Sequence, residues 1–265
     1  MNRIKDAAEL YAQYVSLNVR SAMQHKASFF LQIVGQLLTS MTTFLGIAFM
    51  FMRFDQVAGY TYSEVLVCFS IVLLQFSLAE MFARGFDAFS SLVRKGEFDR
   101  VLVRPRSTIL QVLGARFELT RLGRLMQAAI VFAYGMTASA IEWTAFRVLT
   151  LTSMLLGGML LFAGLYLVYA AFCFFTLEGL EFMNVFTDGG REYGKYPIDV
   201  YGDKMKKFTT FVVPYALVQY YPLQLLIGRS DCWYYALYPL GTVFFLAACY
   251  AFWRFGVRRY TSSGS

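Results

Sequence analysis

Four acidic residues lie inside or beside long apolar segments, where ionisable groups usually mark a transport pathway or an internal ion pair. Glu80 stands four residues before Arg84, the spacing that brings opposite charges together on one helix face. We expect a structural ion pair here, with a transport role for Glu80 as the alternative. Glu178, Glu181 and Asp188 form a second acidic group, which would either attract a cationic substrate or belong to a cytoplasmic loop.

The sequence lacks the residue sets of several other chemistries. Gly194-Lys195 is followed by Tyr196, where a nucleotide-binding loop has Ser or Thr. His25 is the only histidine, so neither a His-based metal cluster nor a Ser-His-Asp set is expected, and we place it at the membrane interface. No cysteine pair has the spacing of a metal site: Cys68, Cys173, Cys232 and Cys249. We expect this chain to bind no cofactor and no metal.

Six long apolar stretches must position these residues. A bilayer core about 30 Å thick needs roughly 20 apolar residues in helical form. The stretches do not alternate with period two, which argues against a membrane β-barrel, so their backbone groups must pair within helices. They cover residues 27–52, 65–83, 122–141, 146–177, 208–228 and 232–255.

Composition leads to the same class of protein. Hydrophobic residues make up 58% of the chain and charged residues 15%, against about 45–50% and 25% in soluble domains. The net charge of +7 indicates basic loops at an anionic membrane surface rather than nucleic-acid binding. We predict an all-α integral membrane protein with six transmembrane helices in a single domain, 1–265.

Basic residues near the segment ends predict the orientation. If both termini are cytoplasmic, 21 of the 24 Lys and Arg residues lie inside, which leaves Arg53, Arg147 and Arg229 outside. Residues 1–26 carry apolar side chains at helical spacing and predict an amphipathic helix in the membrane interface, or one packed on neighbouring loops.

The stretch 178–231 leaves two arrangements open. Gly189-Gly190 interrupts its polar part, and Pro214 and Pro222 interrupt its apolar part. Either a cytoplasmic loop precedes a plain span, or the region is a broken or re-entrant element. In the second case 178–190 is the fifth crossing and 196–228 lies at the outer surface, which leaves 16 basic residues inside against eight outside.

The most specific signal lies between the second and third stretches. Phe86, Phe89, Leu92 and Val93 fit one face of a short helix, and the segment Gly96-Glu97-Phe98-Asp99-Arg100-Val101-Leu102-Val103-Arg104-Pro105 follows. Here the chain resembles the permease subunit of an ABC transporter of the type-two exporter class. It is similar within that class to the small bacterial branch that works as two different permeases plus an ATPase. The loop of that branch typically reads Gly-x-Leu-Asp-x-x-Leu-x-Arg-Pro, and Phe98 replaces the usual Leu.

Further residues in the order and approximate spacing of that branch extend the resemblance over nearly the whole chain. They are Glu181, Asn184, Phe186-Thr187, Gly189-Gly190, Tyr196-Pro197, Val213-Pro214, Tyr220-Tyr221-Pro222 and the tail from Trp253 to Tyr260.

The resemblance implies a cytoplasmic coupling helix between Asp87 and Arg104, within a coupling region 84–108, that rests in a groove of a separate ABC ATPase. It implies that these residues couple to the ATPase: Phe89, Leu92, Gly96, Glu97, Phe98, Asp99, Arg100, Arg104 and Pro105. ATP and Mg would bind to two ATPase copies. A second homologous permease, or a second copy of this chain, would complete the pathway in the lipid bilayer.

Together these observations predict a non-enzymatic permease subunit in a bacterial cytoplasmic membrane, with both termini in the cytoplasm. Its cargo would be a hydrophobic or amphiphilic compound, with cationic, drug-like compounds included. The alternatives are an ion-coupled secondary transporter and an integral-membrane enzyme. The first would need an internal repeat or midplane charge pairs, and the second a clustered His or carboxylate site, and neither feature is evident.

Overall fold

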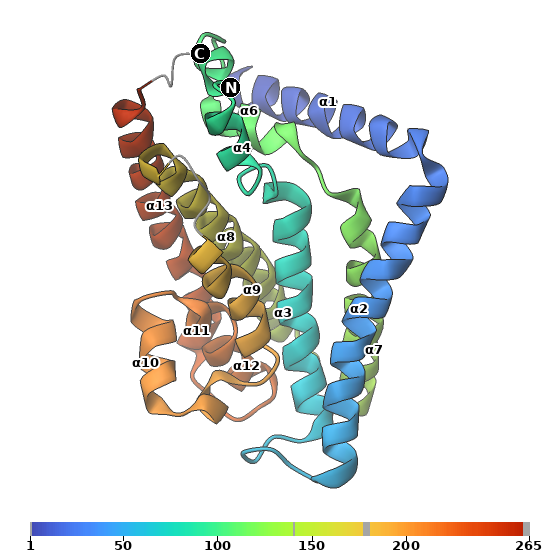
Figure 1. Cartoon of the computed structure of the whole chain (residues 1–265). Helices are drawn as coiled ribbons and strands as arrows, with labels where there is room; N and C mark the ends of the chain where they lie inside the picture. Colours follow the sequence, from blue (N-terminus) through green and yellow to red (C-terminus); the bar gives the residue numbers. More distant parts are fainter. Residues whose placement is uncertain (1, 140, 177–180, 262–265) are drawn as a thin grey trace.

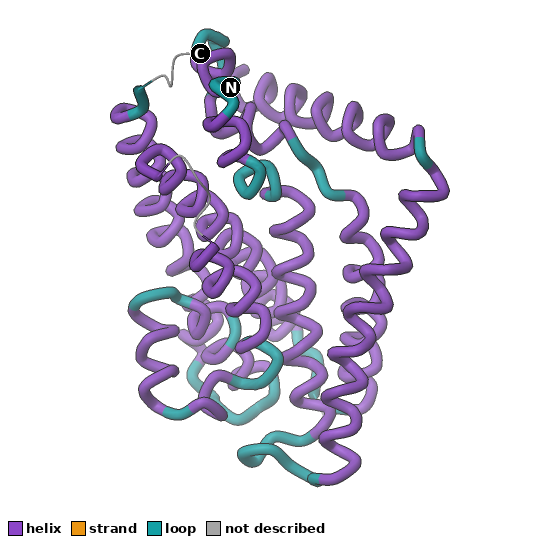
Figure 2. Tube along the Cα trace, in the orientation of Figure 1, coloured by secondary structure: helices purple, strands orange, loops and turns teal. Residues whose placement is uncertain are grey.

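The computed structural model describes residues 2–139, 141–176 and 181–261, and this part of the chain consists of helices and turns without a strand (Figures 1 and 2). Five long helices run side by side along one direction (Figure 1). They are α2 (Lys26–Arg53), α3 (Tyr62–Ala83), α7 (Leu122–Ala138), α8 (Ala145–Thr176) and α13 (Gly241–Arg259). The prediction of an all-α membrane protein is confirmed.

Four helical segments in the described residues are long and apolar enough to cross a membrane. They are α2, α3, α8 and the continuous segment Trp233–Arg259, which joins the 3₁₀ helix η4 (Trp233–Leu240) to α13. Pro239 lies inside η4, and its missing N–H explains why the predicted sixth stretch does not begin as a regular α-helix. With 17 residues, α7 is about 26 Å long, slightly shorter than the bilayer core. The count of six spans therefore stays a prediction.

Helix α3 is the centre of the bundle. Of the 18 consecutive residues that form its most apolar part 83% are buried, against 11% for the corresponding part of α2. Apolar side chains cover all faces of α3. It packs against α7 and α8, while α8 packs against α13. Small residues allow these helices to approach closely. At Gly158 of α8, for example, a Cβ atom would lie 2.2 Å from the side chain of Gln75 in α3 and would collide with it.

The end of the bundle that holds both termini is covered by α1 (Asn2–Gln24) and three short helices, α4 (Phe89–Arg94), α5 (Phe98–Leu102) and α6 (Thr108–Ala115) (Figure 1). Helix α1 crosses this end at a steep angle to α2. It is fixed by hydrogen bonds from Tyr11 to the Phe82 carbonyl (3.1 Å) and from Asn18 to the Gly114 carbonyl (3.2 Å). The helix predicted for 1–26 is thus present, and it packs on the end of α3 and on α6.

The stretch 203–228, which contains the predicted fifth span, is not one helix in the structure. It forms α10 (Asp203–Phe211), α11 (Tyr215–Val218) and α12 (Tyr220–Leu226), after the helices η2 (Glu181–Met183), α9 (Asn184–Tyr193) and η3 (Ile198–Tyr201). Pro214 directly precedes α11, where its ring and missing N–H separate α11 from α10.

Three contacts place this broken region at the end opposite the termini. The Tyr60 hydroxyl lies 2.9 Å from the Asp199 carboxylate, and Gln224 donates to the same hydroxyl at 2.5 Å. Burial raises the pKa of Tyr60, so its hydroxyl stays protonated and available as a donor. Arg229 pairs with Glu64 at 2.8 Å, in the first turn of α3. Residues 196–229 therefore pack against α3 from Glu64 as far as Gln75, whereas the coupling region follows its other end.

Candidate functional site: the coupling region and the buried ion cluster beside it

A glycine turn joins α4 to α5 and sets the shape of the coupling region. Gly96 has φ of +68°, its N–H donates to the Val93 carbonyl, and the N–H of Glu97 donates to the Leu92 carbonyl. These two bonds make the Schellman motif, which closes a helix end and needs a left-handed residue at the position of Gly96. The first glycine of the sequence motif therefore has a defined backbone role.

Five aromatic side chains, the aromatic cluster, join the coupling region to the membrane helices. Phe89 and Phe98 have ring centroids 5.1 Å apart, and Phe89 lies 4.9 Å from Trp253 of α13. Phe98 also lies 5.3 Å from Phe174 of α8 and 5.1 Å from Tyr260. The pairs Phe89–Phe98 and Phe98–Tyr260 are edge-to-face and the other two are tilted, and such aromatic contacts stabilise an arrangement beyond the burial of their area. The cluster therefore fixes α4 and α5 to α8 and α13.

The rings of Phe89 and Phe98 are covered by the rest of the protein. Both residues are 0% exposed, and Leu92 packs against the same core, so the role of these three residues in coupling stays a prediction. Asp99 lies beside Tyr260, whose pKa is raised by burial and, after it, by this carboxylate. Phe89, Leu92 and Phe98 thus form the apolar side of α4 and α5. Helices of five and six residues are stable only when such a side packs against the rest of the protein.

The outer surface of α4, α5 and the following turn is what a partner could contact. Val103 is 84% exposed and Leu102 is 41% exposed, with cationic residues on both sides. We call this surface the coupling face, and it consists of Arg94, Lys95, Glu97, Arg100, Leu102, Val103, Arg104, Pro105 and Arg106. Apolar side chains surrounded by polar ones are the usual make-up of a protein–protein contact.

A buried ion cluster lies where α3 approaches the coupling region. Glu80 is only 2% exposed, and its two oxygens contact Arg84 (2.7 Å) and Arg124 of α7 (2.5 Å), with Arg121 of the short helix η1 (Leu119–Arg121) at 3.4 Å. The predicted Glu80–Arg84 pair is present, and two further arginines join it. Arg124 also donates to Gln36 of α2 at 2.7 Å. The Glu80 carboxylate therefore joins α3 to α7, and Arg124 extends the connection to α2.

The other predicted acidic residues have different surroundings. Asp188 of α9 lies 3.8 Å from Arg191, and Glu181 is exposed on η2. Arg191 and Arg124 lie against the same Phe76 ring, at 5.1 and 5.5 Å from its centroid. The ring thus connects Asp188 to the ion cluster through two cations, although no carboxylate contact joins them. Glu178 lies outside the described residues.

A small polar cavity of about 40 Å³ adjoins this ring, between α2, α3, α7 and the end of α9. Its charged lining consists of Arg124, Arg191, Glu192 and Lys195, and the buried Ser40 hydroxyl of α2 has no hydrogen-bond partner there among the described residues. A cavity of this size holds water or one small polar group. Three cations against one carboxylate make it unsuited to a cation.

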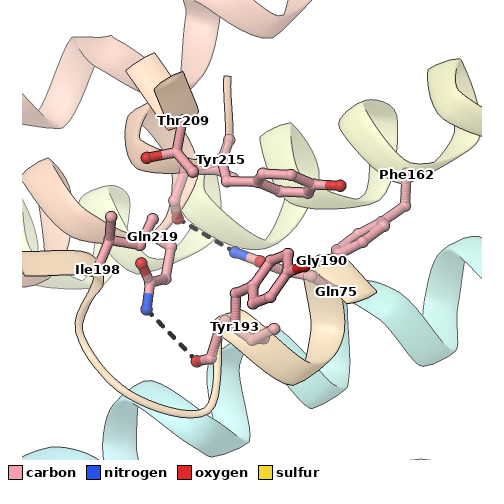
Figure 3. Close-up of a pocket in the computed structure, with 11 residues that line it drawn as sticks. Gln75, Phe162, Gly190, Tyr193, Ile198, Thr209, Tyr215 and Gln219 are labelled. Carbon is pink, nitrogen blue, oxygen red and sulfur yellow. Dashed lines mark hydrogen bonds between the residues drawn. The ribbon is translucent and has the colours of Figure 1, made fainter. Parts of the chain in front are cut away.

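Two glutamines stabilise the broken region where its backbone would otherwise lack partners (Figure 3). Gln75 of α3 donates to the carbonyls of Val218 (3.2 Å), as drawn in Figure 3, and Met154 (2.9 Å). Gln219 donates to the carbonyls of Gly194 (3.4 Å), also drawn there, and Tyr196 (2.9 Å). Irregular backbone survives at membrane depth only with such internal partners. The space between them is about 10 Å³, room for about one water, so this is a structural centre rather than a substrate site.

Sequence reasoning missed Arg124, Gln75 and Gln219. Each is a polar residue inside an apolar stretch, and that was the available signal. Their partners lie between 23 and 151 residues away, so spacing alone gave no pair.

The fold and these sites define a polytopic helical membrane protein with the exposed coupling face at one end and a broken element at the other. The family model described as ABC-2 family transporter protein matches residues 37–264. The chain belongs to this family and is a membrane-embedded permease subunit of an ABC transporter. No curated protein and no solved structure matches the chain.

Proposed function

We propose that this chain forms the translocation pathway of an ATP-driven exporter for a hydrophobic or amphiphilic compound. ATP and Mg would bind to two separate ABC ATPase subunits, and this chain would perform no catalysis. The membrane subunits of this family are not themselves enzymes, and an ABC ATPase is the partner that the family implies.

The aromatic cluster is the observation that carries the proposal. It fixes the coupling region to α8 and α13, while the coupling face stays exposed. A displacement of α4 and α5 by a bound ATPase would therefore reach two long helices directly. Closure of the ATPase pair would bias the permease between two packing arrangements, which is how a ligand bound elsewhere switches a helical bundle.

The position of the broken region supports one orientation in the membrane. The coupling face must meet a cytoplasmic ATPase, so both termini would also be cytoplasmic and residues 196–229 would lie outside. This arrangement has 16 basic residues inside and six outside, with Arg191 and Lys195 in the cavity within the bundle, which still agrees with the distribution of charge in membrane proteins. The membrane would be the cytoplasmic membrane of a bacterium.

A second permease, homologous or identical, would complete the pathway. Helix α2 is the least covered of the membrane-spanning candidates, and Gly35 and Gly46 have open space around them. Thr39 and Thr42 lie on its exposed surface. Small and hydroxyl residues allow close helix approach in lipid, which supports a partner helix along this side.

The charge of the interior bears on the cargo. The cavity beside Arg124 and Arg191 does not favour a cation, so a cationic compound would have to use the exposed Asp188 and Glu181. The ion-coupled secondary transporter loses its support, because the chain belongs to a family of ABC permeases.

The test is purification of the chain with its ATPase and partner permease, followed by a screen for compounds that stimulate ATP hydrolysis. Arg104→Glu on the coupling face should reduce ATPase binding or stimulation, whereas the matched charge reversal Arg53→Glu at the opposite end should not. Saturable ATP hydrolysis by the isolated chain, or equal behaviour of the two variants, would contradict the proposal.

A further inference from the structure

An apolar groove of about 640 Å³ lies on the half of the bundle that bears the termini. Five elements line it, α1, α3, α6, α8 and α13, with side chains such as Tyr11, Phe86, Leu113 and Leu167. Its volume falls within the range of ligand sites, about 300–1,000 Å³. Apart from Tyr11 and Tyr250, the side chains that line the groove are apolar. The groove therefore suits the hydrocarbon chains of a lipid rather than its headgroup.

A second, basic cavity of about 420 Å³ continues this groove toward the end of α13. The two share Ile109 and Tyr250, so they are parts of one depression. Arg254 and Arg258 line the basic part, one helical turn apart on α13. Both are exposed, and neither forms an ion pair with an acidic residue in the described part of the chain. Two unneutralised guanidinium groups therefore face this cavity.

The first turn of α6 adds donors to the same place. Ser107 precedes this eight-residue helix and lines the cavity together with Thr108, and its side chain makes no capping hydrogen bond. The free N–H groups of a helix start carry partial positive charge and bind phosphate oxygens readily. The cavity is thus lined by two hydroxyl groups, the first turn of a helix and two arginines, which are groups that bind phosphate, and it adjoins the apolar groove.

We propose that this combined depression binds one anionic phospholipid, with its acyl chains in the groove and its phosphate at Arg254 and Arg258. A zwitterionic lipid would fill the groove equally well, but it has no net negative charge to offset the two arginines, whereas an anionic lipid offsets one of the two charges. The lipid would bridge α6, which directly follows the coupling region, to α8 and α13 and so stabilise the docked position of that region. It is a resident ligand of the fold, distinct from the transported cargo.

The test uses the purified chain alone, so it is independent of the proposed transport function. The chain is mixed with dioleoylphosphatidylglycerol or dioleoylphosphatidylcholine in detergent, and retained lipid is measured by native mass spectrometry with the thermal unfolding midpoint in parallel. Phosphatidylglycerol should be retained one per chain and should raise the midpoint. Phosphatidylcholine should bind more weakly by roughly thirtyfold, the factor expected for two surface charges.

Two variants and a control separate the parts of the site. Arg254→Gln with Arg258→Gln should abolish the preference for phosphatidylglycerol, whereas Arg53→Gln with Arg259→Gln should keep it. Ala247→Phe fills the exposed groove wall without a change of charge and should reduce retention of both lipids. Equal retention of both lipids by the unmodified chain overturns the proposal, as does an unchanged preference in the double arginine variant. Release of the bound lipid by ATP hydrolysis in the assembled complex would identify it as cargo and overturn it too.

Discussion

Oε2 of Glu80 lies 2.5 Å from Nη1 of Arg124, although the two residues are 44 positions apart and both are buried in apolar helices. This contact and the two further arginines make Glu80 the only carboxylate within ion-pair distance of Arg124 and Arg121 in the described part of the chain. Glu80, for which the sequence predicts a structural ion pair with a transport role as the alternative, thus has structural partners for both carboxylate oxygens.

Glu80→Gln should destabilise the fold strongly, because it leaves the guanidinium groups of Arg121 and Arg124 without a carboxylate and Arg84 with Asp87 alone. Removal of one member of a buried ion pair costs about 3–5 kcal/mol. The thermal unfolding midpoint in a fixed detergent measures this, with the exposed Glu142→Gln as the matched control. An unchanged midpoint for Glu80→Gln would show that the cluster does not hold the bundle together.

Phe98→Ala should loosen the coupling region, since a fully buried ring in the aromatic cluster is lost, at a cost of about 3–5 kcal/mol. Phe98→Leu, which restores the residue common in related loops, keeps most of the apolar volume and should cost far less. Cargo-stimulated ATP hydrolysis should fall in the first variant and persist in the second. Equal activity in both would argue that the cluster transmits no movement.

Gly96→Ala should strain the turn between α4 and α5, because a left-handed residue other than glycine costs roughly 1–2 kcal/mol. The change is local, so we expect weaker binding of the ATPase with little loss of global stability. Gly35→Ala, at a helix position with open space around it, is the control. ATPase binding as strong for Gly96→Ala as for this control would be inconsistent with a required turn.

Gln219→Leu should destabilise the broken region, because the carbonyls of Tyr196 and Gly194 lose their buried hydrogen-bond donor. Each group left unpaired costs about 1–3 kcal/mol. Faster hydrogen exchange in residues 196–228 would report it. Gln32→Leu on the exposed side of α2 makes the same chemical change without this loss. Identical exchange in the two variants would remove the glutamine from the account.

Orientation can be tested by labelling. Single cysteines at Asp203 and Lys206, in a background without the four native cysteines, should react with an impermeant reagent added to intact cells. The structure places both at the end opposite the termini. Labelling only after permeabilisation would restore a cytoplasmic position for this region.

The long apolar stretches were predictable because length and composition alone define a membrane-spanning helix, and α2, α3 and α8 begin and end within about three residues of the expected positions. Pro214 and Pro222 also predicted that the stretch 208–228 would not be one continuous helix. The local pattern could not show whether a side chain faces the core or the solvent. Phe98 fits an exposed or a buried position equally well until α8 and α13 are placed beside it. The partners of Glu80 and Gln219 depend in the same way on packing between distant segments.

The central claim is that the coupling face binds the ATPase. A single cysteine at Val103, the most exposed apolar residue of that face, tests it by cross-linking to the co-expressed ATPase in membranes, with a cysteine at the exposed Val212 of the broken region for comparison. We predict a permease–ATPase product from position 103, changed in yield by ATP, and none from position 212. A product from 212, or none from 103 in a complex that hydrolyses ATP, would contradict the account.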